Sequence, residues 1–323
     1  MKTKEELLHW ADEKEVVSSN KPLLFLFSML QKLPNWLFFL FIYPIAFFFY
    51  IFSKRGRVES KNYQKQLKQY TNGLSPKKIS PFKQILSFSF CVVEKMAGWL
   101  GNFHYDELIT HDDDLKNLQT QLENGKGALL IGSHLGNIEL LRGLSSFGED
   151  GVNKKISITT IMELKSTEQF NKTLQEINPN VNFQVVDPST IGINSIIEFQ
   201  EQIENGGLVV ITGDRTSAKA RSRVIRQKFL GKDADFPYGV FVLATLLKAP
   251  TYYIFGLREK TSMLNPKYNI FIEKSNIDFK NSNQKREEKI TLLCTEFIQK
   301  LEKFCIKFPY QWYNFYNFWL LAK

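Results

Sequence analysis

The sequence predicts an α/β fold in which a mainly parallel sheet is covered by helices, preceded by a hydrophobic N-terminal helix. Apolar runs that fit buried strands recur between residues 127 and 273, and amphipathic runs that fit helices lie between most of them. Such alternation is typical of parallel sheets with helical crossovers. With 323 residues and 43% hydrophobic side chains, the chain can bury a sizeable core.

The N-terminal part is expected to hold a membrane anchor. Residues 1–20 fit a charged amphipathic helix, and an apolar segment follows over residues 22–52, with no charge between residues 33 and 52. About 20 helical residues reach about 30 Å, the thickness of the bilayer core. Basic residues follow at once, which favours a cytosolic location for that side. Pro44 leaves open a spanning or an interfacial helix, and a buried hairpin of a soluble protein is the alternative.

The remaining elements follow in order within one domain. Residues 1–57 are assigned to the amphipathic and anchor segment, and residues 58–323 to a single domain that opens with a helical stretch. That stretch covers residues 81–99; strands are expected at 127–132, 156–162, 181–187, 207–213, 251–257 and 268–273, and helices at 138–147, 166–177, 191–205, 238–248 and 284–307.

Charge and composition narrow the classes of partner. The chain carries 42 Lys and Arg against 33 Asp and Glu, a net charge of +9, which suits an anionic lipid surface or an acidic carrier protein. We expect no nucleic-acid partner, because the basic residues do not alternate with a recognisable stacking motif. Three widely spaced cysteines and four scattered histidines match no metal or disulfide pattern, so we expect no metal. Nucleotide-binding glycine motifs are also missing from the sequence.

The run His134 to Glu139 is the strongest candidate for chemistry. It follows an apolar strand and opens an amphipathic stretch, so that a histidine and a carboxylate lie at a strand-to-helix turn. Histidine can take a proton from a hydroxyl, and a carboxylate can orient it and stabilise the imidazolium. Gly136 allows a close backbone approach to a ligand, and the amides of Gly136 and Asn137 would stabilise an oxyanion. A capping histidine beside a solvated glutamate is the alternative.

A second group follows the strand at residues 207–213. Asp214 and Arg215 are expected on the same edge of the sheet as His134, because the carboxyl ends of parallel strands line the ligand crevice. Asp214 would orient the acceptor or a catalytic group, and Arg215 would hold an anion. Arg221 and Arg223 belong to a basic run that either binds phosphate or a carrier protein or is a solvated face.

The aromatic C-terminus is interpreted mainly as packing. Its residues Gln311 and Trp312 either border the site or belong to the core.

Together these segments resemble the lipid A late acyltransferase family, within the lysophospholipid acyltransferase-like superfamily. The resemblance rests on the N-terminal apolar segment, SHLGNIE at the first strand end, GDR at a later one, FLG and FPYG before a helix, KAPTYYIFGL, and a closing P-x-Q-W. It covers nearly the whole chain. FNKTLQEINP and QWYNFYNFW are similar to the branch associated with aryl polyene and flexirubin-type biosynthesis.

The resemblance implies a glycerol-3-phosphate/lysophospholipid acyltransferase-like fold and acyl transfer from an acyl carrier protein thioester to a lipid hydroxyl. By carry-over, His134 is the general base, Glu139 its partner and Asp214 an acidic residue near the site. It further implies a bacterial inner-membrane enzyme with its catalytic domain on the cytoplasmic face. The acyl thioester is a co-substrate, and no cofactor is expected.

One segment departs from the lipid A enzymes. Those enzymes carry an arginine-rich stretch before Asp214, whereas this chain has Lys165 and Lys172 there and no arginine. The acceptor is therefore left as a membrane glycolipid or pigment lipid, with Lys172 as a candidate binding residue. Two other function classes remain open: a thioesterase or lipid hydrolase that uses the same pair on water, and a non-catalytic membrane protein that binds an acyl carrier.

Overall fold

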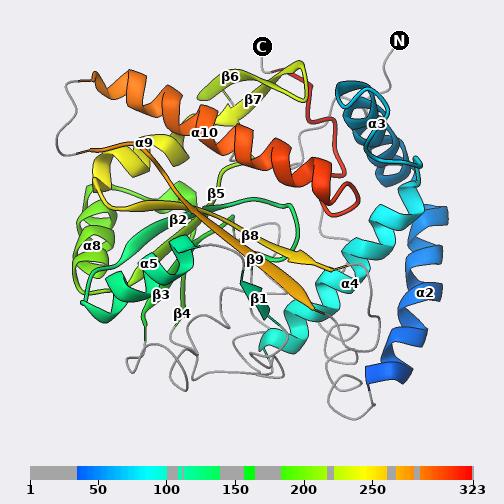
Figure 1. Ribbon diagram of the computed structural model, residues 1–323, viewed down its shortest axis with the longest axis horizontal. Helices are drawn as coiled ribbons and strands as arrows, with labels where there is room; N and C mark the ends of the chain where they lie inside the picture. Colours follow the sequence, from blue (N-terminus) through cyan, green and yellow to red (C-terminus); the bar gives the residue numbers. More distant parts are fainter. Residues whose placement is uncertain are drawn as a thin grey trace.

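The computed structural model describes residues 35–99, 108–110, 113–138, 156–163, 183–216, 222–259, 267–279 and 284–321. Its centre is a seven-stranded sheet with the order β1-β9-β8-β2-β5-β3-β4 (Figure 1). Neighbouring strands are parallel except for the antiparallel pair β8 and β9. The predicted α/β fold with a mainly parallel sheet is confirmed. The strands are β1 (Leu108–Thr110), β2 (Ala128–Gly132), β3 (Ile158–Ile161), β4 (Phe183–Val186), β5 (Leu208–Thr212), β8 (Thr251–Arg258) and β9 (Tyr268–Lys274).

Both faces of the central strands are buried, which explains the continuous apolar runs in β2 and β8. In β2, Leu129 and Ile131 belong to the larger core cluster, whereas Ala128 and Leu130 belong to the smaller one on the other face. This alternation is the expected period of two for a strand.

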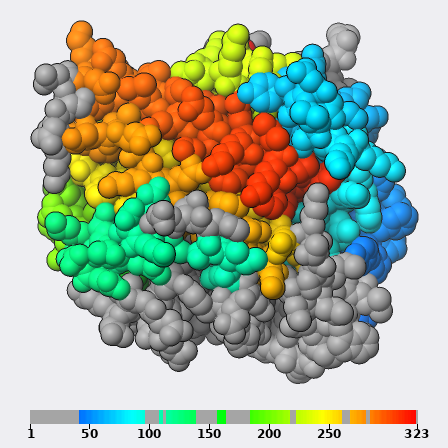
Figure 2. All heavy atoms as spheres, viewed as in Figure 1, coloured from blue at the N-terminus to red at the C-terminus, as the bar shows by residue number. Residues whose placement is uncertain are grey.

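Helices cover the two faces unequally (Figure 1). The larger cluster includes residues of α8 (Ile193–Glu204), α9 (Tyr238–Leu247) and α10 (Arg286–Lys307), and the smaller one includes α5 (Asp113–Glu123). In the space-filling view α10, coloured orange to red, fills the middle of the molecule (Figure 2). The helices predicted at residues 138–147 and 166–177 lie outside the described residues.

A two-stranded hairpin, which the sequence analysis did not predict, lies outside the main sheet. It consists of β6 (Val224–Phe229) and β7 (Lys232–Pro237), paired antiparallel. The ring of Phe229 packs against the rings of Phe236 and Trp312, with centroids 6.0 and 5.1 Å away. The hairpin therefore joins the C-terminal tail to the core.

In the described part of the N-terminal region, three helices precede the sheet: α2 (Asn35–Phe52), α3 (Lys54–Tyr70) and α4 (Pro81–Trp99). Ile42 of α2 packs on Phe90 and Val93 of α4. None of the helices in the described part of the chain has the length and apolarity needed to cross a membrane. The predicted helix over residues 1–20 lies outside the described residues, and the predicted domain boundary at residue 57 falls within α3.

Candidate active site

The site forms at the carboxyl ends of two neighbouring strands. His134 follows β2 and Asp214 follows β5, and Gly132 pairs with Thr212 in the parallel register of these strands. Two residues beyond each strand, the two side chains meet. The sequence places them 80 positions apart, and the register brings them together.

The contact between His134 and Asp214 is direct. The Nδ1 atom of His134 lies 2.8 Å from Oδ1 of Asp214. The backbone N–H of His134 also donates to this carboxylate, at 3.1 Å to Oδ1 and 3.0 Å to Oδ2. Asp214 therefore fixes both the ring and the backbone of the histidine.

Asp214 is fully buried, and its second oxygen has further donors from the C-terminal tail. Nε1 of Trp312 donates to Oδ2 at 3.1 Å, and Nδ2 of Asn314 donates to the same oxygen at 3.2 Å. A buried carboxylate is costly unless it is paired and hydrogen-bonded, and this one has both kinds of partner.

Electrostatics make His134 a neutral base at ordinary pH. Desolvation, followed by the positive charge of Arg215, lowers the pKa of His134 to about 4 against the opposing pull of Asp214. Burial alone would raise the pKa of Asp214, but His134 and Arg215 outweigh it and lower that pKa to about 2. An ionised carboxylate only accepts, so Nδ1 carries the proton and Nε2 has the free lone pair. The side chain of His134 is 30% exposed, which leaves it accessible to a substrate.

The C-terminal tail runs beside the His134 loop like an added strand. Leu135 and Trp312 form an antiparallel bridge, and the N–H of Tyr313 donates to the carbonyl of His134 at 2.9 Å. Trp312 is thus both a fully buried core residue and a neighbour of the site. Asn314 was missed in the sequence, where its one usable signal is a carboxamide within a run of aromatic residues.

The expected roles of Gly136 and Asn137 need correction. The N–H of Gly136 donates to the carbonyl of Gln311, and that of Asn137 to the carbonyl of Gly256, both at 2.8 Å. Neither amide is left for an oxyanion in this conformation. Gly136 has a φ of 75°, and an added Cβ would lie 2.1 Å from the oxygen of Gly256. The glycine therefore permits close approach to β8 rather than to a ligand.

The other residues predicted for the site lie in different parts of the chain, and some of them are outside the described residues. Arg215 donates from Nε to Oδ1 of Asn314 at 2.7 Å and from Nη2 to the carbonyl of Tyr313 at 2.8 Å, so it braces the tail. Arg223 is exposed at the start of β6. Three predicted residues lie outside the described part of the chain: Glu139, Lys172 and Arg221.

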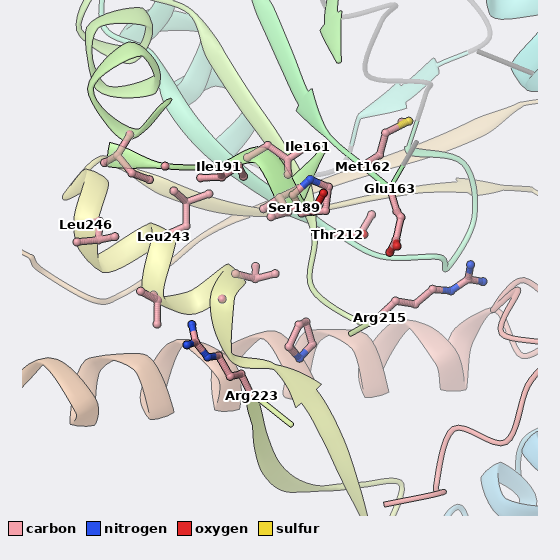
Figure 3. A pocket seen from close by; sticks show the side chains of 18 of the residues that line it. Ile161, Met162, Glu163, Ser189, Ile191, Thr212, Arg215, Arg223, Leu243 and Leu246 are labelled. Atoms are coloured by element: carbon pink, nitrogen blue, oxygen red, sulfur yellow. The ribbon is translucent and has the colours of Figure 1, made fainter. Parts of the chain in front are cut away.

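A large cavity with a volume of about 980 Å³ lies near the end of β5, although neither His134 nor Asp214 lines it. Figure 3 shows Leu243 and Leu246 of α9 at one side of it, and Glu163 and Arg215 at the other. Most of the lining is apolar and comes from α8, α9 and the ends of β3 and β5. Thr212 and Arg215 flank Asp214 along the chain, so the cavity begins at the strand end that carries the carboxylate.

Within the described ranges, no group of three or more His, Cys, Asp and Glu side chains could hold a metal ion. Cys91, Cys294 and Cys305 are all buried, and none of them forms a disulfide.

Comparison with known families gives the site its context. The family model for bacterial lipid A biosynthesis acyltransferase matches residues 91–321, which include β2, β5 and the C-terminal tail. The chain belongs to this family. A comparison with curated proteins gave no match. Membership of the lipid A biosynthesis acyltransferase family identifies the chain as an acyltransferase with a lipid acceptor. The predicted resemblance is confirmed at the level of the family.

Proposed function

We propose that this acyltransferase moves a fatty acyl group from an acyl carrier protein thioester to a hydroxyl of a membrane glycolipid or pigment lipid, with His134 as the general base. The observation that carries the proposal is the 2.8 Å contact between Nδ1 of His134 and Oδ1 of Asp214. It leaves Nε2 for the substrate, as the ordered histidine of an acyl-transfer site requires.

The reaction needs one proton relay and no covalent enzyme intermediate. Nε2 of His134 removes the proton of the acceptor hydroxyl, whose oxygen forms a bond to the thioester carbonyl carbon. Asp214 stabilises the imidazolium that results. When the tetrahedral intermediate collapses, the C–S bond breaks and the imidazolium returns the proton to the departing sulfur. Ester and thiol are the products, and the histidine is neutral again.

The cavity between α8 and α9 suits the acyl chain. Its lining combines apolar side chains such as Ile196 and Leu243 with the cationic side chains of Arg215 and Arg223. Apolar surface would stabilise an alkyl chain by about 0.8 kcal/mol for each buried CH₂ group. The arginines would meet the phosphate of the phosphopantetheine arm that carries the thioester.

We also propose that the protein works at the cytoplasmic face of a bacterial inner membrane, with α2 lying in the bilayer surface. Along α2, Phe41, Ile45, Phe48 and Phe52 are exposed at helical spacing, and the basic start of α3 follows. An exposed apolar stripe beside cationic residues is typical of interfacial helices. The acceptor would then reach the site from the membrane.

We propose that the acceptor is not lipid A. The enzyme would belong to the family branch associated with aryl polyene and flexirubin-type biosynthesis. The support is the sequence alone: the stretch before Asp214 lacks arginine, and the tail reads QWYNFYNFW. Lipid mass spectrometry of a deletion strain and its parent would identify the missing acylated lipid. An unchanged lipid profile, with the chain expressed in the parent, would contradict an acceptor among the membrane lipids.

The catalytic role of the pair is tested with His134→Gln and Asp214→Asn. Both variants should lose about 10³-fold or more of the transfer rate from myristoyl-acyl carrier protein to lipid extracted from the deletion strain. Asp235→Asn is the matched control, because it removes a carboxylate bonded to Arg226 on the hairpin. The proposal fails if folded His134→Gln transfers at the wild-type rate. Equal thioester loss with and without the lipid extract would favour a thioesterase.

A further inference from the structure

Two side chains of the C-terminal tail donate hydrogen bonds to the catalytic carboxylate. We propose that Trp312 and Asn314 are positioning residues that keep the Asp214 carboxylate ionised and aimed at Nδ1 of His134. This inference rests on the proposed function, because it assigns the tail a task in the same proton relay. The family match supplies no role for either residue.

The first argument is the hydrogen bonding of the carboxylate. Oδ1 of Asp214 accepts a hydrogen bond from Nδ1–H of His134. The orientation of the carboxylate therefore depends on the donors to Oδ2. Two of the donors to Oδ2 come from tail side chains, Trp312 at 3.1 Å and Asn314 at 3.2 Å. If both were lost, Oδ2 would keep only the backbone N–H of His134, at 3.0 Å, and the carboxylate would be oriented less firmly toward the ring.

The second argument is that each tail donor is itself held in place. The indole of Trp312 is fully buried and packs edge-on against Tyr63 and Phe318, with ring centroids 4.8 and 4.7 Å away. The amide of Asn314 has a defined orientation. Its Oδ1 accepts from Nε of Arg215, which leaves Nδ2 for the carboxylate. Both donor side chains are therefore held in a single orientation.

The charged and titratable surroundings leave few other groups to control the carboxylate. Lys95 of α4 and Arg215 act on the imidazole as positive charges. Burial raises the pKa of the Cys305 thiol on α10 and of the Tyr316 hydroxyl in the tail, so both stay neutral at ordinary pH. Burial raises the pKa of Asp214, whereas His134 and Arg215 lower it. The neutral N–H donors of the tail add two hydrogen bonds to its Oδ2 atom.

The sign of the effect follows from the state that the donors prefer. An N–H donor stabilises the carboxylate anion and not its protonated form, so removing it raises the pKa of Asp214. A protonated Asp214 can instead donate its O–H to Nδ1, so the tautomer with a proton on Nδ1 and a free Nε2 is no longer favoured. The acidic limb of the pH–rate profile is set by His134. A carboxylate that shares less of its charge with the tail stabilises the imidazolium more, so the pKa of His134 rises and the limb moves to higher pH.

Trp312→Phe and Trp319→Phe form the matched pair for the test. Trp312→Phe keeps a ring in the aromatic cluster and deletes the donor to Asp214. Trp319→Phe deletes an indole N–H in the same cluster, but that group donates to the carbonyl of Phe229 at 3.2 Å. For Trp312→Phe we expect kcat to fall about tenfold or more, with little change in KM. We also expect the acidic limb to rise by about one pH unit. Trp319→Phe should leave the limb where it is.

Asn314→Asp is the second variant and does not depend on the aromatic cluster. It keeps the shape and the bond from Arg215, but it puts a second carboxylate beside Asp214 in place of a donor. Two carboxylates so close cannot both ionise freely, so the limb should rise by roughly two pH units.

Myristoyl-acyl carrier protein and the deletion-strain lipid serve as substrates, and the pH range is 3 to 9. An unshifted limb in both Trp312→Phe and Asn314→Asp overturns the positioning role, even if their rates fall. Full transfer by His134→Gln would instead overturn the proposed base, so the two failures are distinguishable.

Discussion

At the scale of single residues, the site joins a neutral imidazole to an ionised carboxylate. Burial and the charge of Arg215 lower the pKa of His134 to about 4, whereas a free histidine titrates near 6.5. Because the neutral ring is the active base, a lowered pKa extends activity toward acid. The folded state therefore binds this proton less readily than the unfolded state does. Lowering the pH from 6.5 to about 4 decreases the free energy of unfolding.

This residue-level balance predicts the pH dependence of the wild-type enzyme. The rate of acyl transfer should be nearly constant from pH 8 to about 5.5, with an acidic limb well below 6.5. The profile of kcat/KM should be recorded with saturating carrier-protein donor. Denaturant unfolding at each pH separates titration from loss of fold, because protonation of buried His134 also weakens the native state. A limb at 6.5 or above in the folded protein would contradict the lowered pKa.

At the scale of elements, α8 and α9 define a cavity whose size should select the acyl chain. Gly239 near the start of α9 lines this cavity, and a Cβ added there would meet nothing within 4 Å. Gly239→Leu should therefore add bulk without a clash. We expect the preferred acyl chain to shorten by two to four carbons, since each excluded CH₂ group costs about 0.8 kcal/mol, or about fourfold in rate.

Competition among C10, C12, C14 and C16 thioesters measures this preference. Gly239→Ala is the control, because it gains helix propensity in the same way as leucine but adds only one carbon. If both variants keep the wild-type chain-length preference, the acyl chain does not occupy the cavity.

The strands also show which parts of the fold could be predicted from the sequence. The six predicted strands are present because each is a mainly apolar run, and central ones such as Ala128–Gly132 are buried on both faces. The hairpin β6 and β7 was missed, since strands such as Lys232–Pro237 alternate charged, small and aromatic residues at the edge of the fold. Periodicity detects burial, and these strands are only partly buried.

The site was predictable where strand ends determine it. His134 and Asp214 follow apolar strands, so the parallel-sheet rule places them on one edge. Trp312 and Asn314 could not be assigned in this way, because Asp214 lies about 100 positions earlier in the chain and only the folded tail brings them there. Gly136 was misread for a related reason: the sequence gives its conformational freedom but not the approach of Gly256.

At the scale of the whole molecule, the N-terminal helices connect the active-site tail to the proposed membrane face. Nε2 of Gln84 on α4 donates to the carbonyl of Trp312 at 2.5 Å, and Tyr63 of α3 packs on the Trp312 ring. Helix α2 packs on α4 and exposes its other side. In Figure 1, α2 and α8 lie at opposite ends of the long axis. The end that carries α2 would face the bilayer.

This arrangement predicts that α2 determines membrane binding. Phe48 and Phe52 are 59% and 79% exposed, and the double variant F48S/F52S should weaken binding to anionic vesicles by about tenfold or more for each residue. Co-sedimentation with vesicles of phosphatidylethanolamine and phosphatidylglycerol measures the partition coefficient. I193S/I197S on α8 is the matched control, since Ile193 and Ile197 are 81% and 50% exposed at the other end of the molecule. Equal losses in both double variants would show that apolar exposure in general, and not the α2 stripe, drives binding.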